Sequence, residues 1–554
     1  MNLIIALVLA LTTLAACIYN LYSRNRYLIH MLQLEGYRNN NFSKWLKEFK
    51  HRAYNRNLLI GIGISIIVMI LSILIFNRFE QNNIIIYLSI IIWDILIALS
   101  GITKKENFKV KLKITDRVKR LIRTDIIVNT VSGLLIILFM AILYNFFNIL
   151  LANTIFIGFI LASILIYYQT KILLLTNSIN KPIEEKINRK YFVEAQNKIR
   201  SIDGLNIVGI TGSYGKTSTK FLTATILEEK FKTLKTPESY NTPMGVSLVI
   251  NRDLDPSYEV FVAEMGARNI GDIEEMVDLV GNKIGIITSV GPAHLETFKN
   301  IENIKNTKYE IVKGLPEDGI AVFNYDNKYV KELSDRTEGI QKINYGIKED
   351  SVDIYAKDIV VGPEGSEFIL GVRGGEEIKC STRLLGEHNI LNILAGASAG
   401  IALGMGLQEI AKGISKIEAV PHRLQLINPG TGVIIIDDAF NSNPDGARAA
   451  LNVLSKFKEG RKIIITPGMI ELGESEFEEN KEFGRNIAKV CDYAILVGED
   501  RAIPIKEGID EMGFDSNSIF IVKSLDEATK ILPNLTRPKD IVLFENDLPD
   551  NYNK

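Results

Sequence analysis

A run of nine residues, GITGSYGKT from Gly209 to Thr217, has the residue types and spacing of a phosphate-binding loop. An apolar, strand-like run at 205–210 precedes it, and a helix-like run at 217–230 follows it. The loop therefore lies where a strand leads into a helix, which is a common arrangement for binding phosphate groups.

Each position in this loop has a chemical reason. Gly212 and Gly215 let backbone N–H groups approach an anion closely, Lys216 supplies a cation, and Thr217 offers a hydroxyl group to Mg²⁺. The standard spacing is incomplete, because Ile210 stands five residues before Gly215 where a glycine is expected. An ordinary glycine-rich turn that ends in an exposed lysine is the alternative.

Two further polar residues follow apolar, strand-like runs, at the edge where doubly wound sheets hold their ligands. Glu264 follows the run at 259–263, and His294 comes shortly after the run at 284–288. Each alone is more typical of a solvated edge or a structural histidine. Together with Thr217 they offer oxygen and nitrogen ligands of the kind that Mg²⁺ or Mn²⁺ accepts.

The first third of the 554-residue chain is strongly apolar. Uncharged or nearly uncharged segments at 2–21, 57–77, 83–102, 126–147 and 149–170 are each long enough for a membrane span of roughly 20 residues. The first could instead be a signal peptide, but it lacks a basic start and a clear cleavage site. We therefore expect residues 1–177 to form a membrane domain with about five transmembrane helices.

The distribution of basic residues predicts the orientation of these spans. The segment at 22–56 holds eight lysines and arginines and that at 103–125 holds nine, whereas Arg78 is the one basic residue in the other two loops. Basic loops stay cytoplasmic, so we expect a multi-pass cell-membrane protein whose N-terminus lies outside and whose later domains lie in the cytoplasm. These loops could also touch membrane lipids. Asp94, within the third span, has either a structural partner or a substrate role.

Composition narrows the class of protein further. The 64 basic and 65 acidic residues nearly balance, so no overall field indicates nucleic-acid binding. The three cysteines are far apart in sequence and suggest neither a disulfide framework nor a zinc site.

After a charged connector at 178–204, strand-like and helical stretches alternate, which predicts α/β domains with parallel sheets. We expect a P-loop-type, parallel-sheet ATP-binding domain at 205–428, interrupted by an antiparallel insertion at 350–384. A C-terminal, Rossmann-like α/β domain is expected at 429–554, with strand candidates beginning near 432.

A series of motifs over residues 205–500 resembles the Mur ligase family, in the order found there, and is most similar to its MurF-type branch. That branch adds D-alanyl-D-alanine to a muramoyl tripeptide. The motifs are TGSYGKTSTK, YNTPMGVSL, EMGARNIGDI, ITSVGPAHLETF, NTKYEIVKGL, GEHNILNILAGASAG, PHRLQ and IDDAFNSNP.

The resemblance assigns roles to individual residues. It implies that Lys216, His294 and Lys308 are catalytic and that Thr217, Glu264, His294 and Lys308 hold Mg²⁺, with Lys308 carried as a carbamate. Without the family, Lys308 reads as a surface lysine. His388, in GEHNILN, is as readily a packing residue as a contact. The implied nucleotide contacts are Gly212, Ser213, Gly215, Lys216, Thr217, Ser218, Asn389, Asn392, Arg423 and Asp438.

These groups imply an ATP-dependent amide ligase of cell-envelope synthesis. ATP phosphorylates a substrate carboxylate, and an amino acid or dipeptide then attacks the acyl phosphate. The alternative is a membrane protein whose Mur-like domain binds ATP for regulation or coupling without ligating anything.

Three features depart from the family. The connector at 178–204 is too short for the usual UDP-binding first domain, so we expect a small-molecule or, more specifically, a lipid-linked carboxylate acceptor held at the membrane. Gly468 stands where the branch usually has an aspartate, and the last strand leads into ENDLPDNY in place of a lysine-glycine-serine run. Both of these lie where the incoming amine would be received.

Overall fold

The structure is a computed structural model, and it describes residues 3–78, 83–102, 111–147, 149–238, 240–292, 295–349, 351–362, 365–419, 421–439, 442–470 and 472–546. These residues form two compact units, one up to Ile187 and one from Asn188 onward.

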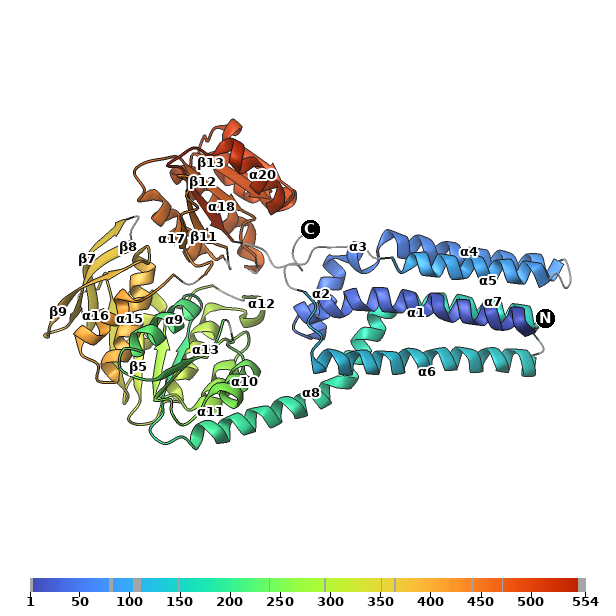
Figure 1. Ribbon diagram of the computed structural model, residues 1–554, viewed down its shortest axis with the longest axis horizontal. Helices are drawn as coiled ribbons and strands as arrows, with labels where there is room; N and C mark the ends of the chain where they lie inside the picture. The colour runs from blue at the N-terminus through green and yellow to red at the C-terminus, as the bar shows by residue number, and fades with distance from the viewer. Residues whose placement is uncertain are drawn as a thin grey trace. The chain divides into compact units, whose positions relative to one another are not determined.

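The described secondary structure of the first unit consists of helices. Figure 1 shows that α1, α4, α5, α6 and α7 run side by side, with the short helices α2 and α3 at one end of the bundle. Its helices are α1 (Leu3–Leu34), α2 (Asn39–Glu48), α3 (Lys50–Ala53), α4 (Arg56–Arg78), α5 (Asn83–Ser100), α6 (Asp116–Phe147), α7 (Leu151–Tyr167) and the start of α8 (Gln169–Arg200).

Among the described residues, four helices are long and apolar enough to cross a membrane, or five if the bent pair α7 and α8 counts as one span. This finding rests on length and composition. The inner faces pack Trp93, Ile97 and Phe156, whereas residues such as Ile67 and Leu74 are exposed on the outside. Helices that are apolar on every side are typical of membrane spans.

The helices extend beyond the predicted apolar segments, so the prediction of simple loops at 22–56 and 103–125 is wrong. Helix α1 continues to Leu34, and α6 already begins at Asp116. The polar ends of these helices are joined by hydrogen bonds, because Asn25 on α1 and Gln169 on α8 both donate to the carboxylate of Asp125 on α6.

Two other polar features of this unit have structural partners. The hydroxyl of Thr12 on α1 donates to Asp94 Oδ2 on α5 at 2.8 Å, which favours the structural interpretation of Asp94. The connector predicted at 178–204 is helical up to Arg200, and Arg120 on α6 forms a bidentate pair with Glu184 on α8.

The second unit begins with a sheet of nine described strands in the order β2-β3-β1-β4-β5-β6-β7-β8-β9. The strands are β1 (Asn206–Thr211), β2 (Thr233–Lys235), β3 (Val260–Glu264), β4 (Ile284–Ile287), β5 (Ile320–Asn324), β6 (Gln341–Gly346), β7 (Ile354–Gly362), β8 (Gly365–Val372) and β9 (Glu377–Thr382). Neighbours from β2 to β7 are parallel, and β8 is antiparallel to β7 and β9.

Helices cover both faces of this sheet (Figure 1). They are α9 (Lys216–Leu227), α10 (Pro243–Asp253), α11 (Asp272–Val280), α12 (Leu295–Phe298), α13 (Ile301–Lys313), α14 (Lys328–Asp335), α15 (Glu387–Ala402) and α16 (Leu407–Ser415). Alternate strand residues face opposite sides, so Val208 packs with α9, α15 and α16, while Ile207 packs with α10, α11 and α13. Two cores therefore hold β1 between them.

A second sheet follows, with its described strands in the order β10-β11-β15-β12-β13-β14, in which β10 alone is antiparallel to its neighbour. Its elements are β10 (Gln425–Ile427), β11 (Ile434–Asp438), α17 (Pro444–Ser455), β12 (Lys462–Thr466), η1 (Gly473–Ser475), α18 (Glu476–Val490), β13 (Tyr493–Val497), α19 (Glu499–Glu511), η2 (Ser516–Ser518), β14 (Ile519–Val522), α20 (Leu525–Leu535) and β15 (Ile541–Glu545).

Two predicted details of this organisation differ from the structure. Strand β10, which precedes the expected boundary at 428, pairs with β11 and so belongs to the second sheet. The segment at 350–384 does form antiparallel strands, but these extend the first sheet through the pairing of β6 with β7 and do not interrupt it.

Candidate active site

The predicted phosphate loop joins β1 to α9. Its two glycines adopt backbone conformations that other residues rarely take, with φ of 156° at Gly212 and 80° at Gly215. A Cβ atom on Gly212 would lie 2.1 Å from the Thr288 hydroxyl. Both glycines are therefore required by the close packing of the loop.

The loop is fixed by the segment that follows β4. Ser213 N donates to Ser289 O at 2.7 Å, and the Thr288 hydroxyl donates to Tyr214 O at 2.6 Å. The Tyr214 hydroxyl reaches Pro292 O at 2.9 Å. Because β4 lies directly beside β1, this segment pre-organises the loop before any ligand is present.

Lys216 begins α9 and folds back over its own loop. Its ammonium group donates to Gly212 O at 2.8 Å and to Ser213 O at 3.2 Å. Burial lowers the pKa of Lys216, and the nearby carboxylate of Glu264 opposes that shift. The ammonium group is therefore held against the loop backbone. An incoming phosphate could replace the two carbonyl groups as the acceptor of its hydrogen bonds.

Glu264, the last residue of β3, is fully buried and accepts three side-chain hydrogen bonds. Its donors are Thr217 at 3.1 Å, Asn241 at 2.9 Å and Lys220 at 3.1 Å. Burial lowers the pKa of Lys220, which its ion pair with Glu264 opposes. Lys220 and Asn241 are not among the predicted site residues, although they lie in the motifs TGSYGKTSTK and YNTPMGVSL.

The donor set around Glu264 fits Mg²⁺. A threonine hydroxyl and a carboxylate are hard oxygen ligands, and Mg²⁺ usually keeps several waters and phosphate oxygens besides one or two protein ligands. Within the described ranges no cluster of three or more His, Cys, Asp or Glu side chains could hold a metal ion by itself. Thr217 and Glu264 would therefore hold the ion together with the phosphates.

Lys308 lies on α13 and is buried, so it is not the surface lysine that its local sequence suggests. Burial and, to a smaller extent, the charge of Lys216 lower its pKa to about 7, against the opposing charges of Asp272 and Glu310. The uncharged form of an amine is the one that reacts with CO₂, and with this pKa a substantial fraction of Lys308 is uncharged at neutral pH, so the site suits a carbamate.

Helix α15 lies against α9. The Thr219 hydroxyl donates to Asn392 Oδ1 at 3.0 Å, and that oxygen lies close to Gly215 of the loop. Asn389 instead donates to Leu385 O within its own segment. Burial lowers the pKa of His388 to about 4, so this imidazole is neutral at physiological pH.

Acidic residues from two neighbouring strands meet at the end of the second sheet. Asp438 on β11 is in register with Glu545 on β15, and Ser442 donates to Glu545. Burial raises the pKa of Asp438 to about 6, although the charge of Arg423 opposes this shift. Burial and the charge of Asp438 raise the pKa of Glu545 well above its ordinary value. The positive charge of Arg423 also lowers the pKa of Lys216. The cluster that contains Arg423 therefore lies within electrostatic range of the phosphate loop.

Comparison with known proteins matches both α/β domains to one family. The Mur ligase middle domain matches residues 210–400, and the Mur ligase glutamate ligase domain matches residues 422–545. The UDP-N-acetylmuramoyl-tripeptide–D-alanyl-D-alanine ligase of Escherichia coli (strain K12) is 31% identical over 60% of this chain and 74% of that protein. The chain belongs to the Mur ligase family.

Two other relatives support this assignment. The ligase of the same name from Buchnera aphidicola (subsp. Baizongia pistaciae) is 32% identical over 52% of this chain, but this chain spans only 62% of that protein. The crystal structure of the MurF ligase from Thermotoga maritima in complex with ADP has a TM-score of 0.58 and 27% identity, over 65% of this chain and 80% of that one. Mur ligases are ATP-dependent ligases that use Mg²⁺, so this chain is an enzyme of that class.

The Mur ligase site assembles most of the predicted residues. Gly212, Ser213, Gly215, Lys216 and Thr217 form the loop, and Ser218 follows in the first turn of α9. Glu264, Lys308, Asn392 and Arg423 lie close enough to interact with residues of this group. His294 lies outside the described residues, so its predicted metal role stays a prediction.

The departures from the family have structural consequences in the second sheet. Gly468 adopts φ of 80°, and its carbonyl accepts a hydrogen bond from Asn546 at 2.6 Å. A Cβ atom at Gly468 would lie 2.6 Å from Asn480 Oδ1, which leaves no room for an aspartate here without rearrangement. Residues 547–554 lie outside the described residues.

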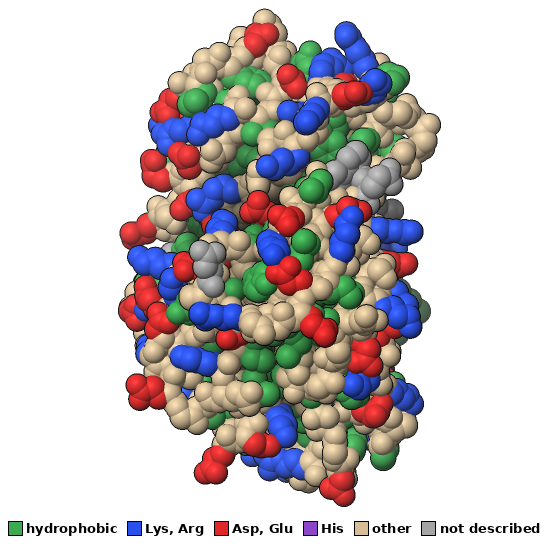
Figure 2. Space-filling model, turned by 90° about the vertical axis from the view of Figure 1, so that its left-hand side faces the viewer, with side chains coloured by type: hydrophobic (Ala, Val, Ile, Leu, Met, Phe, Trp, Pro, Cys, Tyr) green, Lys and Arg blue, Asp and Glu red, His purple; other side chains and the backbone are tan. Residues whose placement is uncertain are grey.

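Charged side chains of both signs are mixed on one face of the second unit (Figure 2). On the face of the second unit shown in Figure 2, lysine and arginine side chains are interspersed with aspartate and glutamate. A binding surface for a polyanion usually gathers cations on one face.

Proposed function

We propose that this Mur ligase forms an amide bond between a carboxylate of a lipid-linked peptidoglycan precursor and an amino acid or dipeptide, at the cytoplasmic face of the membrane. One observation supports the ligase part: Lys308 is buried on α13, and burial together with the charge of Lys216 in the phosphate loop lowers its pKa to about 7. A domain that only bound ATP for regulation would need no such amine.

The proposed reaction has two steps. An oxygen of the acceptor carboxylate attacks the γ-phosphorus of ATP, and the bond to the β-phosphate oxygen breaks to release ADP. The amine nitrogen then attacks the acyl carbon, loses a proton, and inorganic phosphate leaves. The loop N–H groups and Lys216 stabilise the negative charge on the transferring phosphoryl group.

Other residues of the site would hold the metal ion or orient the residues that hold it. Thr217 and Glu264 would hold Mg²⁺, which supplies charge neutralisation on the phosphates when bound. Lys220 and Asn241 orient the Glu264 carboxylate through hydrogen bonds, so they are positioning residues. A carbamate on Lys308 would add a second anionic oxygen ligand.

The lipid-linked acceptor is supported by the helices that precede β1. In the described residues before Asn206 the chain contains helices and no strand, and up to five of them could span a membrane. A ligase held at the bilayer meets a lipid-linked acceptor at a raised effective concentration, because both move in two dimensions.

The incoming amine is the least constrained part of the proposal. The curated relatives are named for D-alanyl-D-alanine, which is the first amine to test. Gly468 and the segment after β15 depart from the family in the region that would receive the amine, so other dipeptides and amino acids belong in the same panel.

The test measures phosphate release by the full chain in detergent, with ATP, Mg²⁺ and an amine panel. Lipid-linked and soluble UDP-linked muramoyl peptides are compared at matched concentrations. We expect faster release with the lipid-linked acceptor. Equal or faster release with the soluble acceptor would refute the lipid part alone, and release with neither acceptor for any amine would refute the ligase proposal for these substrates.

A further inference from the structure

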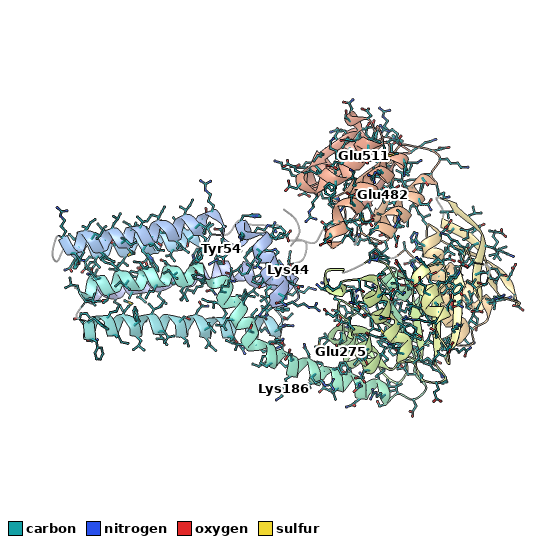
Figure 3. The ribbon with its side chains drawn as sticks, turned by 180° about the vertical axis from the view of Figure 1, so that it is seen from behind. Lys44, Tyr54, Lys186, Glu275, Glu482 and Glu511 are labelled. Carbon is teal, nitrogen blue, oxygen red and sulfur yellow. The ribbon has the colours of Figure 1, made fainter. Side chains whose placement is uncertain are left out.

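A pocket in the first unit lies outside the ligase site. It has a volume of about 840 Å³ and is open to the surface. Residues from α2, α3 and the first turns of α4 line it, together with the junction of α7 and α8. Figure 3 labels Tyr54 at this end of the bundle.

The polar side of this pocket is cationic. Lys47, Lys50, Arg56 and Lys171 line it together with His51, and no aspartate or glutamate does. All five side chains are exposed. Among the described residues the three lysines and the arginine form no ion pair with a carboxylate, so their charges are available to a ligand.

The other side of the pocket is apolar and continues onto a predicted span. Leu59 and Ile60, in the first turns of α4, are 48% and 46% exposed. The rings of Tyr54 and Tyr167 lie 5.2 Å apart, and the Tyr54 hydroxyl is hydrogen-bonded to Thr170 at 2.6 Å. Tyrosines at the ends of apolar helices are typical of a membrane–water interface.

We propose that this pocket binds the phosphate head group of an anionic lipid, with the lipid chains lying along Leu59 and Ile60. Phosphate oxygens would pair with Lys47, Lys50, Arg56 and Lys171, which lie on four separate helices around one opening. Basic pockets between membrane helices are suited to such head groups.

A soluble polyanion fits the pocket less well than a lipid does. A nucleic acid or an acidic peptide would leave Leu59 and Ile60 in contact with water, whereas a lipid covers them and pairs with the cations in the same pose. The apolar side also continues into α4, whose outer residues Ile64, Ile67 and Leu71 are exposed.

The test is a binding titration of the full chain in neutral detergent with fluorescently labelled dioleoyl phosphatidic acid, followed by anisotropy. The triple variant Lys47→Gln, Lys50→Gln, Lys171→Gln should bind roughly a hundredfold more weakly, because each cation near a lipid surface contributes about a fivefold factor. It needs no turnover, so its result is separable from that of the ligase proposal.

The matched control removes three exposed lysines of the same unit that do not line the pocket, as Lys111→Gln, Lys113→Gln, Lys186→Gln. Figure 3 shows Lys186 further along α8, away from Tyr54. The control should bind as the unchanged chain does, and both variants should elute as folded particles in size exclusion.

Three results would overturn the proposal. One is equal affinity in the two triple variants, which would mean that the lipid binds by general charge. Another is equally tight binding of dioleoylglycerol, which lacks the phosphate. The third is displacement of the lipid by an equal concentration of inorganic phosphate, which would assign the site to a soluble anion.

Discussion

Lys216 closes its own loop by donating to two backbone carbonyl groups, and this geometry separates its role in turnover from any role in folding. We expect Lys216→Ala to lower ATP turnover by about a hundredfold or more, because it removes the cation nearest the transferring phosphoryl group. Thermal unfolding should change little, since the group is paired only within its loop. Phosphate release and calorimetry on the same sample check both parts, and near-normal turnover would remove the phosphate-loop assignment.

Lys308 allows a test that distinguishes catalysis from packing. We expect Lys308→Ala to lower turnover by about a hundredfold, with partial recovery when a short carboxylate such as acetate is added, because that anion can replace a carbamate. With limiting bicarbonate, turnover of the unchanged enzyme should rise between pH 6 and 8, since its pKa is about 7 and the uncharged amine increases over this range.

The control for Lys308 is Lys313→Ala in the last turn of the same helix, where the side chain is exposed. It should retain turnover and show no response to acetate. A Lys308 variant that acetate cannot rescue, in an enzyme insensitive to bicarbonate, would contradict the carbamate.

The raised pKa of Glu545 predicts that the stability of the second unit depends on pH. A carboxyl group whose pKa is raised by folding keeps its proton in the folded state at pH values at which the unfolded chain has released it. Its contribution to stability therefore falls as the pH rises above the ordinary pKa of 4.5. Glu545→Gln removes this penalty. We expect it to stabilise the second unit by about 1–2 kcal/mol at pH 8 and by little at pH 4.

Denaturant unfolding at the two pH values measures this difference. Glu478→Gln, an exposed carboxylate on α18, should show no comparable dependence on pH. A stabilisation of Glu545→Gln that is the same at pH 4 and pH 8 would argue against the buried acid pair.

At the scale of the element, α18 and α19 approach each other through two glycines. A Cβ atom on Gly484 would lie 2.0 Å from Ile505 O, and one on Gly508 would lie 1.9 Å from Lys481 O. Backbone atoms cannot yield as a flexible side chain does. We expect Gly508→Ala to separate the helices and to cost about 1–3 kcal/mol.

Hydrogen exchange of the α18 and α19 amides reports on this pair directly. Exchange should accelerate in Gly508→Ala and remain unchanged in Lys506→Ala, which removes one exposed ion pair from the same helix. Unchanged exchange in Gly508→Ala would show that the helices can repack without cost.

Most elements could be predicted because their residues follow a simple pattern. Strands such as β3 and β4 are short apolar runs, and β8 alternates buried and exposed residues. Strands β2 and β10 have three residues each, and β6 begins with exposed polar residues, so neither apolar length nor alternation marks them. They are strands because longer neighbours supply their hydrogen bonds.

Site residues could be predicted from the sequence where the residue type and its local position are enough to indicate its role. The loop and Glu264 stand at strand ends, so their position follows from the fold class. Lys220 resembles a solvated helix lysine, and its burial depends on Glu264, which lies 44 residues later. The pairing of Asp438 with Glu545 depends on the strand order, which places β15 beside β11, and no sequence pattern reveals this.

At the scale of the whole molecule, the basic residues of the first unit give its predicted spans a direction. Arg24 and Arg26 lie in the second half of α1, Arg56 begins α4, and the first turns of α6 carry Arg117 and Arg120. In the five-span arrangement these positions all fall on one side, which the positive-inside rule assigns to the cytoplasm. The ligase domains, which follow an odd number of spans from an outside N-terminus, then lie on the side where ATP is available.

The last prediction is this orientation. A reporter fused after residue 177 should register as cytoplasmic, and one fused after Arg78, at the end of α4, should register as extracellular. Changing the basic residues of α6 at 117, 119, 120 and 123 to glutamine should weaken the preference, because the charge difference across the spans falls. The reverse result for the two fusions would place the ATP site outside the cell, away from its nucleotide, and would refute both the topology and the membrane part of the proposed function.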